Sequence, residues 1–385
     1  MSEVTVGPIA HGGHAVAHVD GRTVFVRGAL PGERVVIEIT EMKSKISRAH
    51  VVQVLDPSPD RVQAPCTWAG MCGGCDFQHV DLAAQRRLKG QVLAETLSRF
   101  AGIDVTDLPG ASVPVHAVPG DLTGLGWRSR MRWSHGTQGW GLRAHRSHDV
   151  VAIDHCLIAV GAIATPPPPA TKGEQSWAAV GSDHASVSTI DNPRHDRSAG
   201  VLQDVHGRVW RMRPDSFWQV HVGAAGLLSD RVQALAQAET GSIWWDLYSG
   251  AGLFAAVLGQ DVGSSGHVEA VEESSQAPRE ARRALHDLPW VSLRSASVGP
   301  WLQRQDGAGL AGVVLDPPRA GVGRVVVDQL ARVAAPRLIY VACDPVALAR
   351  DVTFLAAHGY GLDHIEAWDL FPMTHHFETI AVLSR

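Results

Sequence analysis

The five cysteines of this 385-residue chain divide into a group of four and a single residue. Cys66, Cys72 and Cys75 lie close together, Cys156 follows at a distance, and Cys343 stands alone. A tight trio with one distant partner is the ligand set that four-thiolate binding of a metal ion or an iron-sulfur cluster requires. Cys343 then remains as a candidate nucleophile, because a cysteine thiolate is strongly nucleophilic.

Composition and the N-terminal sequence limit where the protein acts and what it binds. Residues 1–13 lack the basic and then apolar layout of a signal peptide, and no stretch approaches the roughly 18 apolar residues of a membrane-spanning helix. We therefore expect a cytoplasmic protein without a membrane partner, in which reduced cysteines act as ligands or catalysts rather than as disulfides. The net charge of -5 and the pI near 6.5 exclude a uniformly basic nucleic-acid coat protein, so RNA binding would depend on local clusters.

The length predicts several domains, because a single hydrophobic core seldom grows past about 250 to 300 residues. We place them at residues 1–56, 57–215 and 216–385. In the first, short strands broken by glycine turns indicate a small barrel of the oligonucleotide-binding kind. Its basic cluster, which could meet a phosphate backbone or be an ordinary solvated turn, consists of Lys43, Lys45 and Arg48.

The middle segment contains the cysteine group, a helix expected over residues 82–100 and a strand-rich stretch over residues 127–158. Alternating arginines in that stretch would put three guanidinium groups on one strand face, which could track RNA or be salt-bridged. These arginines are Arg128, Arg130 and Arg132. Residues 165–197 begin with a run of prolines and indicate a flexible insertion or loop.

From residue 242 onward, the pattern changes to apolar strands that alternate with helices. This pattern predicts an α/β fold with a parallel, doubly wound sheet, whose ligands bind outside the carboxyl ends of the strands. The expected strands are residues 243–247, 266–271, 312–315, 337–341 and 377–383.

Several chemically informative residues directly follow these strands. The turn at Gly250 and Gly252 lets the backbone pass close to a nucleoside, but it lacks the third glycine of a dinucleotide-binding fingerprint. Glu272, at the end of the next strand, can accept both hydroxyl groups of a ribose. Asp316 precedes two prolines, which fix a loop rim beside the pocket.

Cys343 also follows a strand, and Pro345 is suited to the first position of a helix. A helix N-terminus so close would favour the thiolate. A lone cysteine is otherwise often a small buried residue, so its neighbours decide this interpretation.

In order and spacing, these motifs resemble those of the S-adenosylmethionine-dependent 5-methyluridine RNA methyltransferases. The segments that carry the resemblance are residues 217–221, 250–252, 316–321, 342–351 and 371–378. The residues before about 56 resemble the TRAM domain of the same family. The chain also matches the four ligands of that family's 4Fe-4S cluster, at Cys66, Cys72, Cys75 and Cys156.

The resemblance implies a class I, Rossmann-like methyltransferase domain with an N-terminal, oligonucleotide-binding-type TRAM barrel and a central iron-sulfur α+β domain. It implies that Cys343 adds to carbon 6 of uracil, that carbon 5 takes a methyl group from S-adenosylmethionine, and that Glu378 removes the carbon 5 proton. The cofactor contacts that it implies are Gln219, Tyr248, Glu272 and Asp316. The expected partner is RNA, with 23S ribosomal RNA favoured over transfer RNA, and the expected state is a monomer.

Three departures from the family pattern bear on activity. Asp344 stands where the family usually has asparagine, and a carboxylate beside Cys343 would raise the pKa of the thiol. His221 likewise replaces an asparagine. Residues 294–297 lack the acidic or amide residue that is expected near the adenine.

The sequence leaves alternatives open. Four thiolates also suit zinc, although the gap from Cys75 to Cys156 is long for a compact zinc ribbon. A radical S-adenosylmethionine methylthiotransferase also combines a TRAM domain with a cluster, but it needs a C-x3-C-x2-C motif where this chain has C-x5-C-x2-C. A non-catalytic RNA-binding protein that retains the fold is the remaining alternative.

Overall fold

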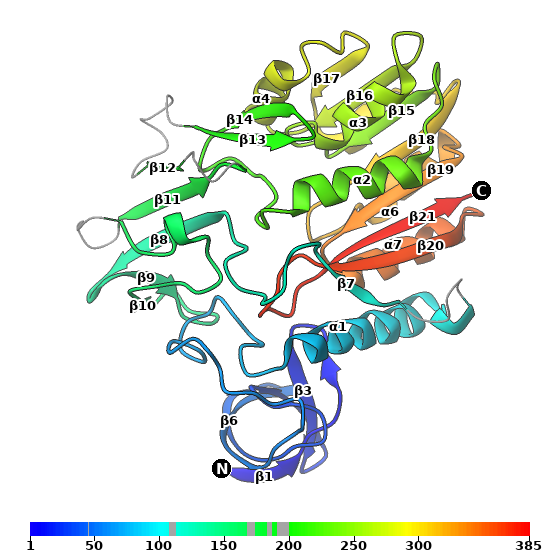
Figure 1. The fold of residues 1–385 in the computed structure, drawn as a ribbon. Coiled ribbons are helices and arrows are strands. Elements are labelled where there is room, and N and C mark those ends of the chain that lie inside the picture. Colours follow the sequence, from blue (N-terminus) through cyan, green and yellow to red (C-terminus); the bar gives the residue numbers. More distant parts are fainter. Residues whose placement is uncertain (45, 108–112, 168–173, 183–186, 191–199) are drawn as a thin grey trace.

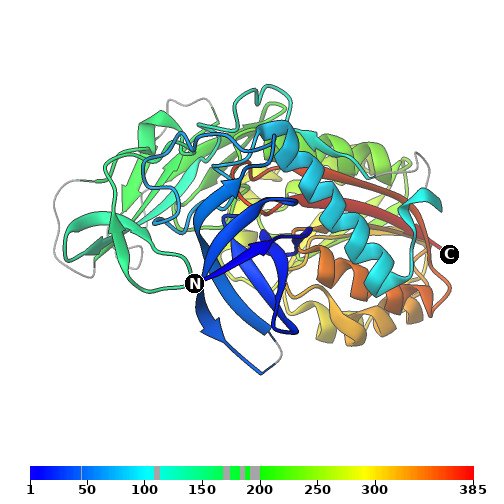
Figure 2. The same ribbon diagram turned by 90° about the horizontal axis from the view of Figure 1, so that it is seen from below.

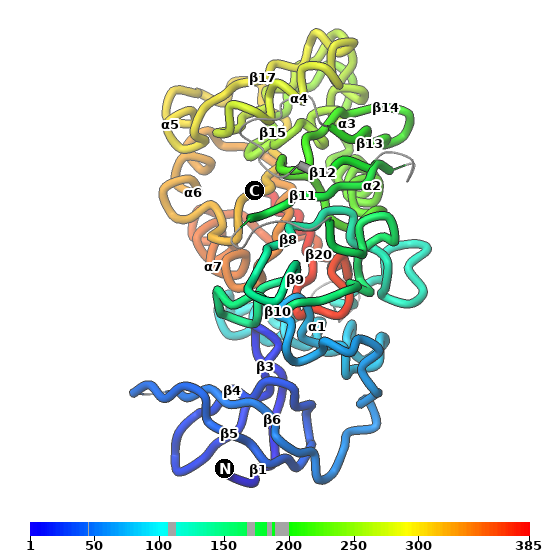
Figure 3. The backbone as a smooth tube through the Cα atoms, turned by 90° about the vertical axis from the view of Figure 1, so that its left-hand side faces the viewer, coloured from blue at the N-terminus to red at the C-terminus, as the bar shows by residue number. Residues whose placement is uncertain are grey.

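The computed structural model describes residues 1–44, 46–107, 113–167, 174–182, 187–190 and 200–385. An N-terminal barrel lies at one end of the molecule, and a layered α/β unit formed by the C-terminal part of the chain lies at the other (Figure 1). A central sheet stands beside the α/β unit. Figure 3 shows the barrel projecting from the rest of the chain.

The barrel has the strand order β1-β5-β6-β4-β3-β2, in which β4 and β6 are parallel and the other neighbours are antiparallel. Its interior is apolar, with Val26, Val35 and Ile37 fully buried. The barrel that the glycine-broken strands predict is therefore present. Its strands are β1 (Ser2–Thr5), β2 (Ile9–Ala10), β3 (His14–Val19), β4 (Arg22–Arg27), β5 (Arg34–Met42) and β6 (Ile46–Asp56).

Two members of the basic cluster of the barrel share one acidic neighbour. Lys43 and Arg48 both pair with Glu41, at 2.8 and 3.0 Å. The remaining member, Lys45, lies outside the described residues. One carboxylate balances one of the two charges, so a net positive charge remains on this turn.

The helix α1 (Leu82–Thr96) connects the barrel to the α/β unit, as the view from below shows (Figure 2). The carboxylate of Asp81 caps it by accepting hydrogen bonds from two backbone N–H groups of the first turn. Beyond α1 the chain continues in a π-helical turn (Leu97–Ala101), which ends at Gly102 with a φ of 65°. One part of α1 packs in the barrel core and the other against the C-terminal sheet. The helix predicted over residues 82–100 is therefore confirmed.

The central sheet has the order β10-β9-β8-β11-β12. Its last two strands, β11 and β12, fall inside residues 165–197. The prediction of a flexible insertion or loop is therefore wrong for the residues of these two strands. Ser176 and Ala178 of β11 are buried where the strand pairs with β8, and this packing accounts for the difference. Residues 168–173, 183–186 and 191–197 of the same prediction lie outside the described part of the chain. The strands are β8 (Arg130–Gly136), β9 (Gly139–Arg143), β10 (Val150–Ala152), β11 (Gln175–Val180) and β12 (Val187–Ile190).

The three alternating arginines do not share an exposed strand face, which contradicts that expectation. Arg130 is 7% exposed, and its Nη1 donates hydrogen bonds to three backbone carbonyl groups within residues 213–216. Arg128 precedes β8 and lines the cavity of the cysteines, whereas Arg132 is exposed. Arg130 thus holds a neighbouring segment of the chain and is not available to RNA.

The C-terminal sheet has the order β17-β16-β15-β18-β19-β21-β20-β7. The predicted strands are confirmed, but the sheet is not wholly parallel, because β21 runs antiparallel to both β19 and β20. A direct loop over residues 370–377 joins β20 to β21, and an antiparallel pair needs no crossover helix. The strands are β7 (Val115–Ala117), β15 (Ile243–Leu247), β16 (His267–Glu272), β17 (Val291–Ser295), β18 (Leu310–Leu315), β19 (Arg337–Ala342), β20 (Gly361–Asp369) and β21 (Glu378–Ser384).

Helices pack on both faces of this sheet (Figure 1). The adjacent residues Trp244 and Trp245 of β15 point to opposite faces and belong to separate buried clusters. One cluster includes α2 (Ala224–Ala236), α3 (Leu253–Val262) and α4 (Ala277–Ala284), and the other includes α5 (Val298–Leu302), α6 (Gly323–Arg332) and α7 (Pro345–Ala356). A hairpin of β13 (Val201–Val205) and β14 (Arg208–Met212) precedes α2. In the described part of the chain, no helix has the length and apolar character needed to cross a membrane.

A buried ion pair joins α1 to the end of β20. The Nζ atom of Lys89 lies 2.5 Å from Oδ1 of Asp369, and the two side chains are 1% and 0% exposed. Lys89 also donates a hydrogen bond to the carbonyl oxygen of Phe371, at 3.2 Å. The pair therefore anchors the start of the loop that leads to β21.

Replacing Lys89 with methionine should destabilise the fold by about 3 to 5 kcal/mol, because the carboxylate of Asp369 would remain buried without its closest cation. Urea unfolding of the Lys89→Met variant measures this loss. Arg87→Met is the matched control, since Arg87 lies on the same helix but pairs with Asp60 at an exposed site. The control should lose less than about 1 kcal/mol, and equally small losses in both variants would contradict the anchoring role.

Candidate active site and four-cysteine site

Cys343 and Glu378 come to the same edge of the C-terminal sheet because β21 runs antiparallel to β19. Ala342 pairs with Thr379 in the register of these strands, so Cys343 and Glu378 occupy the next position on facing strands. This edge is also the one at which β15, β16 and β18 end. The structure thus brings together the thiol and the carboxyl group that were expected to act as a pair.

The groups around the thiol mostly oppose its ionisation. Burial raises the pKa of Cys343 to about 12, and the carboxyl groups of Glu378 and Asp316 add to this shift. The guanidinium group of Arg319 acts in the opposite direction. In the ligand-free protein the thiol is therefore protonated at neutral pH, and its ionisation needs a base or a bound substrate.

Two carboxyl groups at this edge have raised pKa values. Glu378 is 4% exposed, and burial together with the Asp316 charge raises its pKa well above the usual range, while Arg319 opposes the shift. Burial and the Glu272 charge raise the pKa of Asp316 to about 7. Carboxyl groups tuned in this direction suit proton transfer near neutral pH.

The ends of β15, β16 and β18 carry three of the residues that are expected to contact the cofactor. Tyr248 directly follows β15 with a φ of 63°, and Asp316 directly follows β18. Glu272 ends β16, and its carboxylate accepts hydrogen bonds from the N–H groups of Gly250 at 3.0 Å and Ser274 at 2.7 Å. These bonds fix Glu272 and leave further lone pairs for the hydroxyl groups of a ligand.

The glycine turn after β15 has one open and one crowded position. A Cβ atom at Gly250 would point into open space, whereas a Cβ atom at Gly252 would lie 3.0 Å from Leu285. Gly252 is therefore needed for the packing of α3, and Gly250 borders space that a ligand can enter.

Asp246 is a buried carboxyl group that sequence reasoning missed. It lies in β15, and its Oδ2 caps α3 by accepting a hydrogen bond from the N–H group of Ala255 at 2.8 Å. Burial raises the pKa of Asp246 to about 8, and its Oδ1 has no hydrogen-bond partner among the described residues. Its place just before the glycine turn was the available signal, but only the structure shows that it supports the turn.

Gln219 comes from a separate segment, between β14 and α2. The carbonyl group of its neighbour Val220 accepts hydrogen bonds from the N–H and hydroxyl groups of Ser129, at 2.7 and 2.9 Å. His221 stacks on Trp127, with an interplanar angle of 9°. A histidine suits this position because its ring extends the aromatic contact, which an asparagine would not do.

The loop before Glu378 is held by the segment that follows the cysteine trio. The carbonyl oxygen of Met373 accepts hydrogen bonds from the N–H groups of Asp76 and the next residue, both at 2.9 Å. The carboxylate of Asp76 lies 2.6 Å from Nδ1 of His375. Sequence reasoning missed this contact because it joins residues 299 positions apart.

Arg319 is oriented by a neutral histidine in the same loop. Burial, together with the nearby His375 and Arg319, lowers the pKa of His376 to about 3. The neutral ring can therefore accept a hydrogen bond at Nε2 from Nη2 of Arg319, which lies 3.3 Å away. This contact holds a cation near the thiol of Cys343 and the carboxyl group of Glu378.

Asp344, which stands next to Cys343 where the family usually has asparagine, caps α7. Its Oδ1 accepts hydrogen bonds from the N–H groups of Val346 and Ala347, at 3.0 and 2.9 Å. Its Oδ2 lies 3.3 Å from Nε2 of His11, which belongs to the barrel. Burial alone would raise the pKa of Asp344, but the hydrogen bonds from His11 and the backbone lower it overall.

Residues 294–297, which lack the acidic or amide residue expected near the adenine, contact two acidic side chains of neighbouring segments. Arg294 pairs with Glu269 at 2.5 Å, and the hydroxyl group of Ser297 donates a hydrogen bond to Glu273 at 2.6 Å. Glu273 directly follows the end of β16, so a carboxylate from a neighbouring segment stands next to the residues that lack one.

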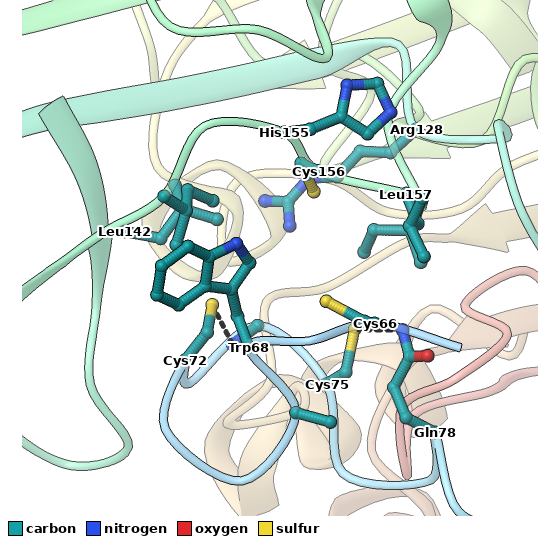
Figure 4. Close-up of a pocket in the computed structure, with 14 residues that line it drawn as sticks. Cys66, Trp68, Cys72, Cys75, Gln78, Arg128, Leu142, His155, Cys156 and Leu157 are labelled. Atoms are coloured by element: carbon teal, nitrogen blue, oxygen red, sulfur yellow. Dashed lines mark hydrogen bonds between the residues drawn. The ribbon is translucent and has the colours of Figure 1, made fainter. Parts of the chain in front are cut away.

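All four cysteines of the group line one cavity (Figure 4). Three come from the loop before α1, and Cys156 comes from the loop after β10. The sulfur atom of Cys72 accepts a hydrogen bond from the N–H group of Gly74, and that of Cys75 accepts one from the side chain of Gln78, both at 3.4 Å. The apolar side chains that line the same cavity are those of Trp68, Ala69, Leu142, Ile153, Leu157 and Ile158.

The four thiols influence one another. Burial raises the pKa of Cys75 to about 12, and the other three thiols of the group add to this shift. All five cysteines are free of disulfide bonds. In the part of the chain that the structure describes, no group of three or more His, Cys, Asp or Glu side chains is arranged to hold a single metal ion.

Two family models match the chain: a TRAM domain over residues 2–52 and a tRNA (uracil-5-)-methyltransferase over residues 306–385. The chain is 38% identical over 431 residues to an uncharacterized RNA methyltransferase of Streptomyces avermitilis, across 99% of this chain and 97% of the relative. It is 30% identical over 440 residues to the 23S rRNA (uracil(1939)-C(5))-methyltransferase RlmD of Shewanella, across 98% and 94%. The chain belongs to the RNA (uracil-C5) methyltransferase family.

A solved structure of an RNA methyltransferase has the same fold. It is the Pyrococcus abyssi tRNA (uracil-54, C5)-methyltransferase in complex with S-adenosyl-L-homocysteine, with a TM-score of 0.75 and 21% identity over 99% of this chain and 100% of that chain. This RNA methyltransferase therefore has a mixed α/β methyltransferase fold with an N-terminal TRAM domain. The family resemblance read from the motifs is confirmed, whereas the iron-sulfur cluster stays a prediction.

Glu378 should make this methyltransferase less stable as the pH rises. Its folded-state pKa is raised by burial and Asp316, so the folded protein keeps the proton at pH values where the unfolded chain releases it. The stability that this provides is present below the unfolded pKa and is lost as the pH rises through the folded pKa. Glu378→Gln should therefore be more stable than the wild type above neutral pH, by at least about 1 kcal/mol, with the difference shrinking toward acidic pH. Urea unfolding at several pH values measures it.

Glu366→Gln is the control with the opposite sign. Glu366 is also a buried carboxyl group of the C-terminal sheet, but hydrogen bonds from Arg231, Trp368 and His364 outweigh burial and lower its pKa. Its stabilisation is present above the unfolded pKa and is lost as the pH falls through the folded pKa. The Glu366→Gln variant should thus be less stable than the wild type at neutral pH, and the same sign for both variants would refute this account.

Proposed function

We propose that this RNA methyltransferase transfers a methyl group from S-adenosylmethionine to carbon 5 of a uracil in RNA. The observation that carries the proposal is the register of β19 and β21, which sets Cys343 opposite the buried carboxyl group of Glu378. Such a pair is needed because carbon 5 of uracil is a poor nucleophile until a thiolate has added to carbon 6.

The residues at the ends of β15, β16 and β18 fit S-adenosylmethionine. Gly250 borders open space, and the fixed carboxylate of Glu272 has lone pairs left for ribose hydroxyl groups. In this proposal, Gln219, Tyr248 and Asp316 line the rest of the site. When bound, S-adenosylmethionine supplies an electrophilic methyl group. In this proposal, the C-terminal sheet is the doubly wound sheet of a class I methyltransferase, and S-adenosylmethionine lies outside the carboxyl ends of its strands.

Cys343 and Glu378 act in turn. The thiol of Cys343 loses its proton to solvent, and the thiolate forms a bond to carbon 6, so that the uracil ring takes up the negative charge. Carbon 5 can then accept the methyl group, with S-adenosylhomocysteine as the leaving group. Glu378, in its ionised form, then removes the proton from carbon 5, and the electrons of that bond restore the ring and expel the thiolate. The N-terminus of α7 and the cation of Arg319 favour the thiolate form of Cys343.

We further propose that Cys66, Cys72, Cys75 and Cys156 hold a 4Fe-4S cluster, with zinc as the alternative. The thiols share one largely apolar cavity, and N–H groups donate to two of the sulfur atoms, as is common around such clusters. Each iron of a cluster takes one thiolate, so its ligands stand further apart than those of a single ion. Because methyl transfer needs no electron transfer, the cluster would support folding and RNA placement.

The expected units, residues 1–56, 57–215 and 216–385, belong to the same proposal. The TRAM barrel and the central unit would grip the RNA around a uridine that has left its stack, which offsets an unstacking cost of a few kcal/mol. We propose 23S ribosomal RNA as the substrate, because the relative RlmD that aligns over almost the whole chain is named for it. Transfer RNA is the second candidate, favoured by the description of the matching family model. We propose that the protein acts as a monomer in the cytoplasm.

Incubation with tritiated S-adenosylmethionine and RNA from a strain that lacks this gene tests the reaction. The wild type should label RNA, and mapping of 5-methyluridine in the ribosomal and transfer fractions identifies the substrate. Cys343→Ala should reduce transfer by at least about a thousandfold, because no other group activates carbon 5. Glu378→Gln should instead accumulate a denaturant-stable protein–RNA complex, since the adduct forms but the carbon 5 proton stays.

Glu366→Gln is the control for these variants and should retain transfer. Labelling that survives Cys343→Ala would refute the mechanism. Absence of labelling by the wild type with both RNA fractions would favour the non-catalytic RNA-binding alternative.

The four-cysteine proposal has its own measurement, metal and sulfide analysis of anaerobically purified protein. About four iron and four sulfide atoms per chain should be present, with broad visible absorbance. Cys72→Ser should lose them, whereas Cys343→Ser should retain them, since Cys343 lies at the other site. Zinc without sulfide would select the alternative, and full iron content in Cys72→Ser would exclude this ligand set.

A further inference from the structure

The barrel reaches the active site through the turn between β2 and β3. Gly13 in this turn has a φ of 76°, and a Cβ atom there would lie 2.8 Å from the Cβ atom of His375. His11 lies in the same turn, with its ring edge-on to that of His375 and the centroids 6.4 Å apart. The turn thus seats closely on the loop before Glu378 and brings His11 to the start of α7.

His11 completes the contacts of Asp344. Both carboxylate oxygens are engaged, because Oδ1 accepts two N–H groups of α7 and Oδ2 lies 3.3 Å from Nε2 of His11. Asp344 directly follows Cys343. The charged and titratable groups that face the thiol are Glu378, Asp316, Arg319 and Asp344. Of the three acidic groups, Asp344 is the one whose side chain meets the barrel.

We propose that His11 is a positioning residue of the active site, which holds Oδ2 of Asp344 and so makes the reactivity of Cys343 depend on the docked barrel. The proposal rests on the proposed role of Cys343 as nucleophile. A carboxylate whose Oδ2 is released can turn toward the thiol or lose a hydrogen bond that disperses its charge, and either change disfavours the thiolate. The contact also suits an aspartate at this position, because its Oδ2 can accept a hydrogen bond from Nε2 of His11.

A double-mutant cycle tests this coupling with His11→Ala, Asp344→Asn and the combined variant. Both substitutions are mild, because the side chain of His11 is 40% exposed and asparagine is a good helix cap. His50→Ala is the matched control, since His50 also lies in the barrel and pairs with a carboxylate, Glu38, at 3.4 Å. The first readout is the rate at which iodoacetamide alkylates Cys343 at one fixed pH without RNA, followed by mass spectrometry of the peptide. The second is kcat and KM for methyl transfer.

His11→Ala should slow alkylation of Cys343 and lower kcat by roughly threefold to tenfold, the effect of up to one pKa unit on the thiolate fraction. KM for S-adenosylmethionine should not change. Asp344→Asn should react at least as fast as the wild type, and the combined variant should match Asp344→Asn, because His11 then has no carboxylate to hold. His50→Ala should behave as the wild type.

A loss caused by His11→Ala that persists at full size in the Asp344→Asn background would overturn the proposal, since His11 would then act through His375 or through RNA. Unchanged alkylation in His11→Ala would overturn it as well. Failure of the proposed function gives a different result. If the wild type and the variants are alkylated at the expected relative rates but the wild type methylates no RNA, methyl transfer is rejected and the coupling of His11 and Asp344 stands.

Discussion

The reversed direction of β21 is the constraint on which the proposed active site depends. In a wholly parallel sheet, the start of one strand and the end of its neighbour lie at opposite edges, and a strand of this length would separate them by about 20 Å. Because β21 is antiparallel to β19, Glu378 begins it at the edge where Cys343 follows β19. Backbone pairing alone therefore brings the thiol and the carboxyl group together. Tyr248 and Asp316 lie at the same edge because the parallel strands before them also end there.

Buried carboxyl groups, which reduce the stability of a fold, are concentrated at this edge of the sheet. Burial raises the pKa values of Asp316 and Glu378, and each carboxyl group has an acidic neighbour that adds to the shift. Arg319 is the cation that opposes the shift at Glu378, and the neutral ring of His376 holds it in place. The apolar layers on both faces of the sheet supply the stability that lets such a cluster persist. The buried carboxyl groups that suit proton transfer thus lower the stability of the same sheet that positions them.

The parts of this molecule that follow from local pattern could be predicted, and the parts that depend on distant contacts could not. Apolar strands separated by helices predicted the C-terminal sheet, and the motif residues predicted where Cys343 and Glu378 lie. The direction of β21 has no local signal, because an apolar strand looks the same in either orientation. The prolines at residues 166–169 concealed β11, which pairs with β8 through residues 175–179. Arginine is a common RNA-binding residue, but the structure shows that Arg130 instead donates hydrogen bonds to backbone carbonyl groups of a distant segment.

The same distinction explains the role of the segment around the cysteines. The residue after Cys75 is Asp76, which contacts His375, while its N–H group binds the carbonyl oxygen of Met373. Lys89 of α1 anchors the start of the same loop at Phe371. The loop that carries the proposed base is therefore fixed from outside the α/β unit, by residues that precede it by up to 299 positions in the sequence. A group bound between the four thiols would stiffen that support without taking part in the chemistry, which is why a redox-inactive reaction can still depend on the cysteine site.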